Sequence, residues 1–116
     1  MNKRLIGSER EEQAAAFLRS RGFTILRHSF RCRLGEIDLI ARDGDTLVFV
    51  EVKYRGSDRF GWGEEHVNAK KQATIFQVAQ VYLNRFCREA PPPCRFDVVA
   101  IDGEKTVYFP NAFEKA

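Results

Sequence analysis

Residues 35–53 have the sequence GEIDLIARDGDTLVFVEVK, in which two runs of alternating polar and apolar residues flank a turn dipeptide. Asp43-Gly44 between such runs predicts a β-hairpin with a two-residue loop, because a type I′ turn needs a positive φ at both central residues. The stretch therefore predicts two antiparallel strands, at residues 36–42 and 46–54.

The register of this hairpin predicts which side chains share a face of the sheet. With that two-residue loop, Asp38 lies opposite Phe49, and Glu36 lies opposite Glu51. Asp38 and Glu51 are then diagonal neighbours, with Cα atoms about 7–8 Å apart. One face is expected to carry charged and apolar side chains together, namely Glu36, Asp38, Ile40, Leu47, Phe49, Glu51 and Lys53. The other face is expected to carry only apolar side chains, namely Ile37, Leu39, Ala41, Val48, Val50 and Val52.

The segments on either side of the hairpin show helical and strand patterns in turn. Ser8 to Glu11 fits a capping box, with a hydroxyl three residues before a glutamate, and predicts a helix over residues 9–21. Further patterns predict a strand at residues 23–30, a helix from Asn68 to about Cys87, and strands at residues 96–101 and 106–109. The core face of the second helix is expected to comprise Ala73, Phe76, Ala79, Leu83 and Phe86.

These elements predict a fold of the α/β class. A strand, a helix and a strand in succession form a right-handed crossover, so the strand at residues 96–101 is expected to be parallel to its neighbour. The result is a mixed sheet flanked by helices, in the order α-β-β-β-α-β-β. A chain of 116 residues has the usual size of one domain, so we expect a single domain over residues 1–116.

Asp38, Glu51 and Lys53 are the candidate catalytic residues. Ionisable side chains on a face shared with apolar ones are costly to bury unless they pair or bind a metal. Carboxylates on neighbouring strands suit Mg²⁺ or Mn²⁺, and such an ion polarises a phosphodiester oxygen and lowers the pKa of a bound water. The alternative is an exposed ion pair of Glu51 with Lys53 on an edge strand, which is worth about 0–1 kcal/mol. The spacing alone leaves both interpretations open.

Glu11 also has two interpretations. The capping box accounts for it as a residue that closes the first turn of a helix. In the other interpretation, the first helix brings Glu11 to the metal site as a further carboxylate beside Asp38 and Glu51.

Arginine outnumbers lysine by 13 to 6, although the net charge is only +3. Residues 19–33 contain five arginines and no acidic residue, and arginine suits bidentate phosphate contacts. The alternative is a solvated helix end and strand face. Trp62 lies in a loop-like, glycine-containing segment, where it either stacks on a base or folds back on the core. The candidate contacts with a phosphate backbone are Arg27, Arg31, Arg33, Lys70 and Lys71.

Several classes of protein are excluded by what the sequence lacks. No apolar run approaches the roughly 20 residues that cross a bilayer, and no secretory signal is visible, so no membrane association is expected. Three cysteines without a CxxC spacing indicate reduced thiols and a cytoplasmic location. Neither a phosphate-binding glycine loop nor a GxSxG motif occurs, which disfavours nucleotide hydrolysis and serine-hydrolase chemistry.

The sequence GEIDLIARDG at residues 35–44, followed by FVEVK at residues 49–53, closely resembles the YraN family of small bacterial proteins. The similarity extends through Glu11, Ala14, Leu18, residues 22–26, Val67, Lys71-Gln72 and residues 95–99. That family is similar in fold to restriction endonucleases and archaeal Holliday-junction resolvases. The resemblance therefore implies a restriction-endonuclease-like α-β-β-β-α-β core.

The resemblance also implies roles for individual residues. The PD-(D/E)xK motif of those nucleases uses an acid, followed by an acid–x–Lys, to hold Mg²⁺ for phosphodiester hydrolysis. Asp38 matches the first acid, Glu51 the second and Lys53 the lysine. Glu11 matches the helix glutamate that resolvase-like members add to the metal site, whereas Ile37 stands where the motif is named for a proline.

Three functional hypotheses follow. The first is a Mg²⁺- or Mn²⁺-dependent endonuclease that acts on branched or structured DNA in repair or recombination. A symmetric junction needs two active sites, so the resemblance implies a homodimer. The second is an accessory protein that binds nucleic acid with the same fold and without turnover. The third is a protein-interaction module that docks through the charged face of the hairpin.

Overall fold

The computed structural model describes residues 3–54 and 67–115 of the chain, with side chains from residue 11 onward. Its elements follow one another in the predicted order. They are α1 (Lys3–Ser20), β1 (Thr24–Cys32), β2 (Gly35–Asp43), β3 (Thr46–Tyr54), α2 (Ala69–Phe86), β4 (Cys94–Asp102) and β5 (Lys105–Phe113).

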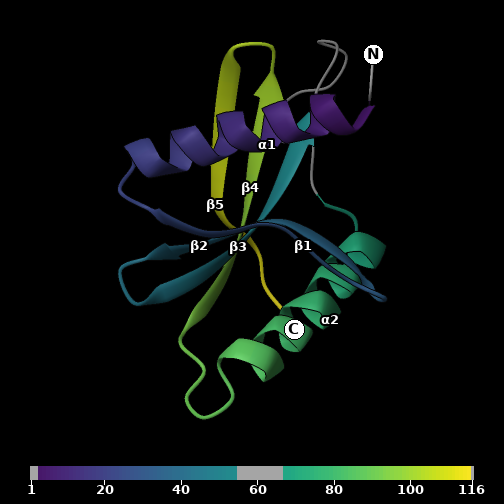
Figure 1. The fold of residues 1–116 in the computed structure, drawn as a ribbon, viewed down its shortest axis with the longest axis vertical. Coiled ribbons are helices and arrows are strands. Elements are labelled where there is room, and N and C mark those ends of the chain that lie inside the picture. The colour runs from purple at the N-terminus through teal and green to yellow at the C-terminus, as the bar shows by residue number, and fades with distance from the viewer. Residues whose placement is uncertain (1–2, 55–66, 116) are drawn as a thin grey trace.

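The strands form one mixed sheet in the order β1-β2-β3-β4-β5 (Figure 1). Neighbouring strands are antiparallel except for β3 and β4, which are parallel and joined through α2. The predicted α/β class and the predicted parallel pair are confirmed.

The two helices pack on opposite faces of this sheet (Figure 1). Under α1, the buried side chains of Ala14, Ala15 and Leu18 contact a cluster that includes Val48 and Val50 of β3. Under α2, a second cluster joins the helix to the aromatic side chains of the sheet, and its members include Phe30, Phe49, Val78 and Tyr82. The sheet therefore has a buried core on each side.

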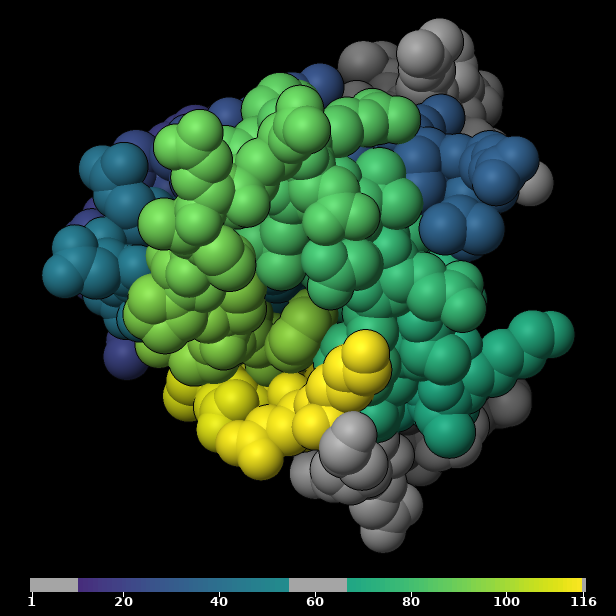
Figure 2. All heavy atoms as spheres, turned by 90° about the horizontal axis from the view of Figure 1, so that it is seen from below, coloured from purple at the N-terminus to yellow at the C-terminus, as the bar shows by residue number. Residues whose placement is uncertain are grey.

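The C-terminal end of β5 lies against α2 (Figure 2). The ring centroids of Phe76 and Phe113 are 5.6 Å apart, and Phe96 of β4 stacks on Phe113 at 5.4 Å. These contacts extend the α2 core to the end of the sheet that is remote from β1. In the described ranges, neither helix combines the length and the apolar character that a bilayer-crossing segment needs.

The first helix starts earlier than the sequence predicts. It begins at Lys3, so Ser8 lies inside the helix and cannot be its N-cap. The capping-box interpretation of Ser8 and Glu11 is therefore wrong, because a hydroxyl three residues before a glutamate is also compatible with a helix interior. Trp62 and the loop predicted around it lie outside the described residues.

The second helix is capped as predicted, but the face that it buries differs from the predicted one. Asn68 accepts a hydrogen bond at its Oδ1 from the backbone N–H of Lys71 at 2.9 Å. The buried positions are Ile75, Val78, Ala79 and Tyr82, whereas Ala73 and Phe86, both expected in the core, are exposed. The Tyr82 ring occupies the core instead, at 5.3 Å from the Phe30 ring and 6.0 Å from the Phe49 ring.

The central hairpin has its loop one residue further along than predicted. Asp43 pairs with Thr46, so Gly44 and Asp45 form the loop, and Ile40 lies opposite Phe49. Gly44 has φ 61° whereas Asp45 has no positive φ, which is the φ pattern of a type II′ turn. The predicted pairing of Glu36 with Glu51 is therefore wrong. Because the register moves by two residues, β3 keeps its predicted faces.

Candidate metal centre

Asp38 lies where the pairing between β2 and β3 ends. The last regular pair is Leu39 with Val50, and beyond it the Asp38 carboxylate accepts a hydrogen bond from the backbone N–H of Val52 at 2.7 Å. This side chain replaces a ladder partner that the backbone of β2 no longer supplies. Asp38 is thus held beside Glu51, rather than diagonal to it as predicted.

The alternation of β2 breaks at the same place. Ile37 belongs to the core under α2, whereas Leu39 and Ala41 belong to the core under α1, so the predicted apolar face is wrong at Ile37. In β1, Ser29 has φ 55°, a left-handed conformation that is uncommon for residues other than glycine. The irregular backbone in both strands turns Glu36 and Asp38 toward the side of the sheet that α1 covers.

Three carboxylates converge on that side. One carboxylate oxygen from each of Glu11, Glu36 and Asp38 lies within 4.8 Å of the others. Glu36 also accepts a hydrogen bond from Ser29 Oγ at 2.8 Å and pairs with Arg31. Glu11 is therefore directed into an acidic cluster by the middle of α1, which is the placement that its second interpretation requires.

Glu51 approaches Asp38 from the other side of the sheet. Its side chain is only 12% exposed, and its Oε2 atom lies 3.6 Å from Lys71 Nζ in the first turn of α2. Burial, and then the neighbouring Asp38 carboxylate, raise the pKa of Glu51 to about 8. The Asp38 and Glu51 carboxyl groups are hydrogen-bonded to each other, and the raised pKa favours the protonated form of Glu51.

All the other shifted pKa values in this cluster have the same direction. Burial raises the pKa of Asp38, and burial together with the charges of Asp38 and Glu36 raises the pKa of Glu11. Raised pKa values in a group of neighbouring carboxylates show that nearby positive charges do not fully compensate their negative charge. An all-oxygen donor set of this kind fits Mg²⁺ or Mn²⁺. Glu11, Glu36 and Asp38 offer ligand atoms that converge, and Glu51 adjoins them through its contact with Asp38.

Two lysines act on Glu51. The positive charges of Lys71 and Lys53 both lower its pKa, and Lys71 has the larger effect. Sequence reasoning assigned Lys71 to phosphate binding alone and missed its contact with Glu51. Lys70, its neighbour, is exposed at the start of α2.

Gly35 explains how α2 can lie so close to the hairpin. A Cβ atom at this position would be 2.6 Å from Cγ2 of Thr74 and 3.4 Å from Cγ2 of Val78. Gly35 also has φ 150°, a conformation that side chains rarely adopt. The glycine therefore permits the close packing that places Lys71 beside Glu51.

The predicted arginine contacts lie along β1. Arg31 is at the acidic cluster, and both Arg31 and Arg33 are exposed. Arg27 is also exposed but lies away from the cluster, with its guanidinium 5.3 Å from the Phe30 ring centroid and 5.4 Å from that of Phe86. The candidate phosphate contacts thus extend from the acidic cluster toward the end of α2.

The sequence analysis did not identify Asp97, a second buried acidic residue. Asp97 of β4 is fully buried, and its carboxylate accepts hydrogen bonds from Arg95, from the Tyr108 hydroxyl and from the backbone N–H of Asn111. Burial and Asp97 raise the pKa of Tyr108 to about 12, and the bond to Asp97 raises the pKa of Arg95. Every partner here is a donor, which is the arrangement of a structural ion pair.

The fold and this site define a mixed-sheet α/β protein in which a β-hairpin, flanked by two helices, gathers carboxylates and lysines at the end of a strand pair. The sequence model of the uncharacterised protein family UPF0102 matches residues 10–101. The chain belongs to that family, which is the YraN family expected from the hairpin motif.

Individual relatives support the assignment over nearly the whole chain. A UPF0102 protein of Janthinobacterium sp. (strain Marseille) is 43% identical over 112 residues, which cover 97% of this chain and 89% of the relative. One from Nitrosomonas europaea is 45% identical over 113 residues, 95% of this chain and 94% of the relative. One from Symbiobacterium thermophilum is 50% identical over 99 residues, which cover 85% of this chain and 83% of the relative.

Proposed function

We propose that this protein is a Mg²⁺-dependent endonuclease of the PD-(D/E)xK type, which also accepts Mn²⁺ and hydrolyses phosphodiester bonds in branched or otherwise structured DNA. The observation that carries the proposal is the contact between Asp38 and Glu51, two hydrogen-bonded carboxyl groups from neighbouring strands whose charges are offset in part by two lysines. Repair or recombination in the bacterial cytoplasm is the setting in which such DNA arises.

The acidic residues of the site would hold the ion. Glu11 and Asp38 offer carboxylate oxygens from α1 and β2 within 4.8 Å of each other, and Glu51, which contacts Asp38, would supply a third from β3. When bound, Mg²⁺ would polarise a phosphodiester oxygen and stabilise negative charge on it. The hydrogen bond from the Val52 N–H to Asp38 fixes one ligand in place, and such outer contacts tune metal affinity.

The lysines act on the substrate side of the site. Lys53, two residues after Glu51 on β3, is assigned to position the attacking water and to balance the charge that develops on the phosphate. Lys71 balances the ionised form of Glu51, because its charge lowers the pKa of that carboxyl group more than the charge of Lys53 does. Arg31, Arg33 and Lys70 are exposed next to these groups and would hold the DNA backbone.

Cleavage of defined DNA tests the proposal. A four-way junction, a flap and a blunt duplex are incubated with the protein in Mg²⁺, in Mn²⁺ and in EDTA. We expect metal-dependent cleavage of the junction or the flap, and a loss of at least about 100-fold in Asp38→Asn and Glu51→Gln. The matched control is Asp45→Asn, which removes an exposed carboxylate from the hairpin loop and should leave the rate unchanged.

The same variants separate the nuclease from a silent binding protein. The protein could fail to cleave DNA in either metal and still bind the junction in EDTA in a salt-dependent way. That result would contradict the endonuclease and favour a nucleic-acid-binding accessory protein. Cleavage that persists undiminished in both Asp38→Asn and Glu51→Gln would show that the activity comes from elsewhere and would overturn the proposal.

A further inference from the structure

Phe86 is a large aromatic residue that the fold leaves open to solvent. It is the last residue of α2, and it is 53% exposed. Its ring is tilted against the Tyr82 ring at a centroid separation of 4.8 Å and packs edgewise against the Phe30 ring at 6.4 Å. These contacts fix the ring in orientation while one side of it remains uncovered.

Arginines gather around this ring. The Arg27 guanidinium, from β1, lies 5.4 Å from the Phe86 ring centroid, and the Arg85 guanidinium lies 5.8 Å from that of Phe30. Cation–π contacts hold both side chains against aromatic rings and leave their N–H groups available. Within the described part of the chain, Arg27, Arg85 and Arg88 have no ion pair with a carboxylate.

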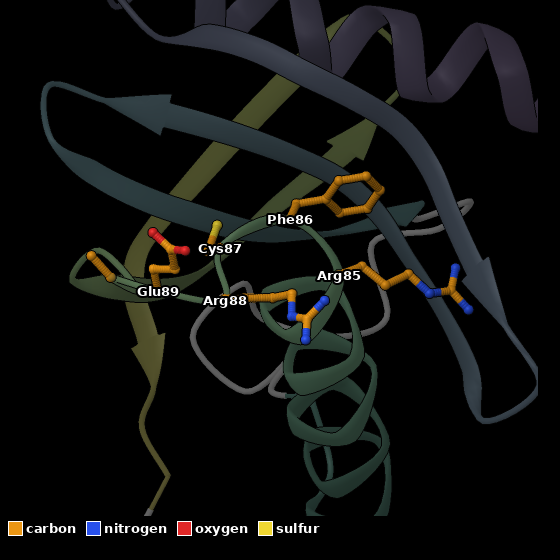
Figure 3. A pocket seen from close by; sticks show the side chains of 6 residues that line it. Arg85, Phe86, Cys87, Arg88 and Glu89 are labelled. Carbon is orange, nitrogen blue, oxygen red and sulfur yellow. The ribbon is translucent and has the colours of Figure 1, made fainter.

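A hollow adjoins the exposed ring. It has a volume of about 430 Å³ and is lined by Arg85, Phe86, Cys87, Arg88, Glu89 and Ala90. The close-up shows Arg85 extended toward β1, and Cys87 and Glu89 on the other side of the helix end (Figure 3). A hollow of this size can hold a planar ring of several atoms, and its cationic groups outnumber its single acid.

We infer that Phe86, together with Arg27, Arg85 and Arg88, forms a binding site for an unpaired nucleotide of a nucleic-acid strand. The base stacks on the open side of the Phe86 ring, and the arginines contact the flanking phosphates. Stacking on an aromatic ring is available to any base, so this site recognises single-stranded character rather than sequence. A duplex offers phosphates to the arginines but no free base to the ring.

The inference rests on the proposed function and gives it a substrate class. Arg31 contacts the acidic cluster and Arg27 contacts Phe86, and these two residues of β1 are about 13 Å apart at 3.3 Å per residue. Along α2, Lys71 and Phe86 are about 22 Å apart at 1.5 Å per residue. At 3.4 Å per base pair, these distances place the point where the strand leaves the duplex about four to seven base pairs from the cleaved phosphate.

Binding measurements in EDTA test the site apart from any cleavage. Fluorescence anisotropy is recorded with a labelled 12-nucleotide single strand, with a blunt duplex, and with a duplex that carries a single-stranded tail. We expect Phe86→Leu to weaken binding of the single strand and the tailed duplex about tenfold, and of the blunt duplex less than about twofold. Phe86→Tyr keeps the ring and should bind like the wild type, which separates loss of stacking from loss of folding.

The arginines have a different signature. For single strands, each phosphate contact contributes about 0.7 to the slope of log affinity against log salt, so Arg85→Gln with Arg88→Gln should lower this slope by about 1.4. The control is Arg19→Gln, which removes one arginine charge from α1 on the opposite face of the sheet, and it should leave the slope unchanged rather than lower it by about 0.7. Glu89→Gln removes a nearby negative charge and should tighten binding.

The outcomes distinguish this inference from the proposed function. Equal single-strand affinity in the wild type, Phe86→Leu and the double arginine variant would overturn the inference, whether or not the protein cleaves DNA. Binding that depends on Phe86, in a protein that cleaves nothing in Mg²⁺ or Mn²⁺, would uphold the site and refute the endonuclease. In an active enzyme, moving the branch point along the duplex should move the cut with it.

Discussion

Asp97 and Asp38 are both carboxylates held within the same sheet, and their surroundings are opposite in character. Asp97 on β4 pairs in the ladder with Val50 of β3, immediately before Glu51. Its carboxylate is surrounded by donors, which are the Arg95 guanidinium, the Tyr108 hydroxyl and the Asn111 N–H. Its negative charge is fully compensated inside the protein.

Asp38 has one backbone donor and mostly acidic neighbours, although the charge of Lys71 also acts on it. The Val52 N–H donates to it, while Glu11, Glu36 and Glu51 add further carboxyl groups around it. The pKa values of Asp38, Glu51 and Glu11 are all raised, which shows that their ionised forms are penalised. The contrast indicates that Asp97 holds β4 to β5, and it supports the proposal that the Asp38 cluster receives a cation from solution.

The largest expected difference is in stability. Asp97→Asn removes the buried carboxylate partner of half-buried Arg95 and leaves it only the more exposed Asp43, so we expect the free energy of unfolding to fall by about 3 kcal/mol. Asp38→Asn removes one of several mutually repelling charges and keeps an acceptor for the Val52 N–H. Urea unfolding of the metal-free protein should therefore show Asp38→Asn as stable as the wild type or more so. An equal loss in the two variants would contradict the comparison.

The pH dependence of stability gives a second test of the comparison between Asp97 and the Asp38 cluster. The folded-state pKa of Glu51 is raised to about 8 from the 4.5 of an ordinary glutamate, so the unfolded chain ionises first as the pH rises. Stability of the metal-free protein should fall between about pH 4.5 and pH 8, by an amount on the order of 2–4 kcal/mol. In Glu51→Gln, thermal unfolding scans across this range should lose most of that slope. The same slope in both proteins would assign it to other groups.

Gly35 tests whether close packing of α2 builds the acidic site. Gly35→Ala introduces a Cβ against Thr74 Cγ2 in a backbone conformation that disfavours it, and should cost about 1–3 kcal/mol. Thr74→Ser removes the contacting methyl group, so the double variant should recover part of this loss. Strictly additive losses in a double-mutant cycle would show that the two residues do not meet.

The smallest expected effect belongs to Lys71. Its side chain is 43% exposed, so its pairing with Glu51 contributes no more than about 1 kcal/mol. Lys71→Met should move the pH midpoint of the Glu51-dependent stability change upward by less than about one pH unit, because a lost positive charge favours the protonated carboxyl. Lys70→Met, one residue earlier, is the matched control and should leave the midpoint in place. A downward movement would reverse the assigned interaction.

Much of the site could be predicted because its main residues are close in sequence. Asp38 and Glu51 belong to one hairpin, and strand alternation and turn chemistry are local properties. The loop was misplaced because the sequence Asp43-Gly44-Asp45 lets Gly44 take either central position of a two-residue turn. A slip of two residues keeps the faces of β3, so the pairing error did not separate Asp38 from Glu51.

What escaped prediction depends on contacts between distant segments. Ser29 of β1 adopts a left-handed conformation beside the point where the side-chain alternation of β2 breaks. No turn motif in the neighbouring sequence predicts this conformation. The buried face of α2 was wrong at Phe86 because apolar residues lie on more than one side of that helix, and the packing of Tyr82 selects among them. Likewise, Lys71 lies beside Glu51 only because Gly35, which has no Cβ atom, lets α2 pack close to the hairpin.

Calorimetric titration with Mn²⁺ tests the central claim most directly, which is that Asp38 and Glu51 hold a divalent cation whereas Asp97 does not. The wild type, Asp38→Asn, Glu51→Gln and Asp97→Asn are compared at a temperature where all four are folded. We predict that the wild type and Asp97→Asn bind Mn²⁺ alike, and that Asp38→Asn and Glu51→Gln lose at least about tenfold in affinity. Equal affinity in all four proteins, or no binding by the wild type at millimolar Mn²⁺, would contradict the account.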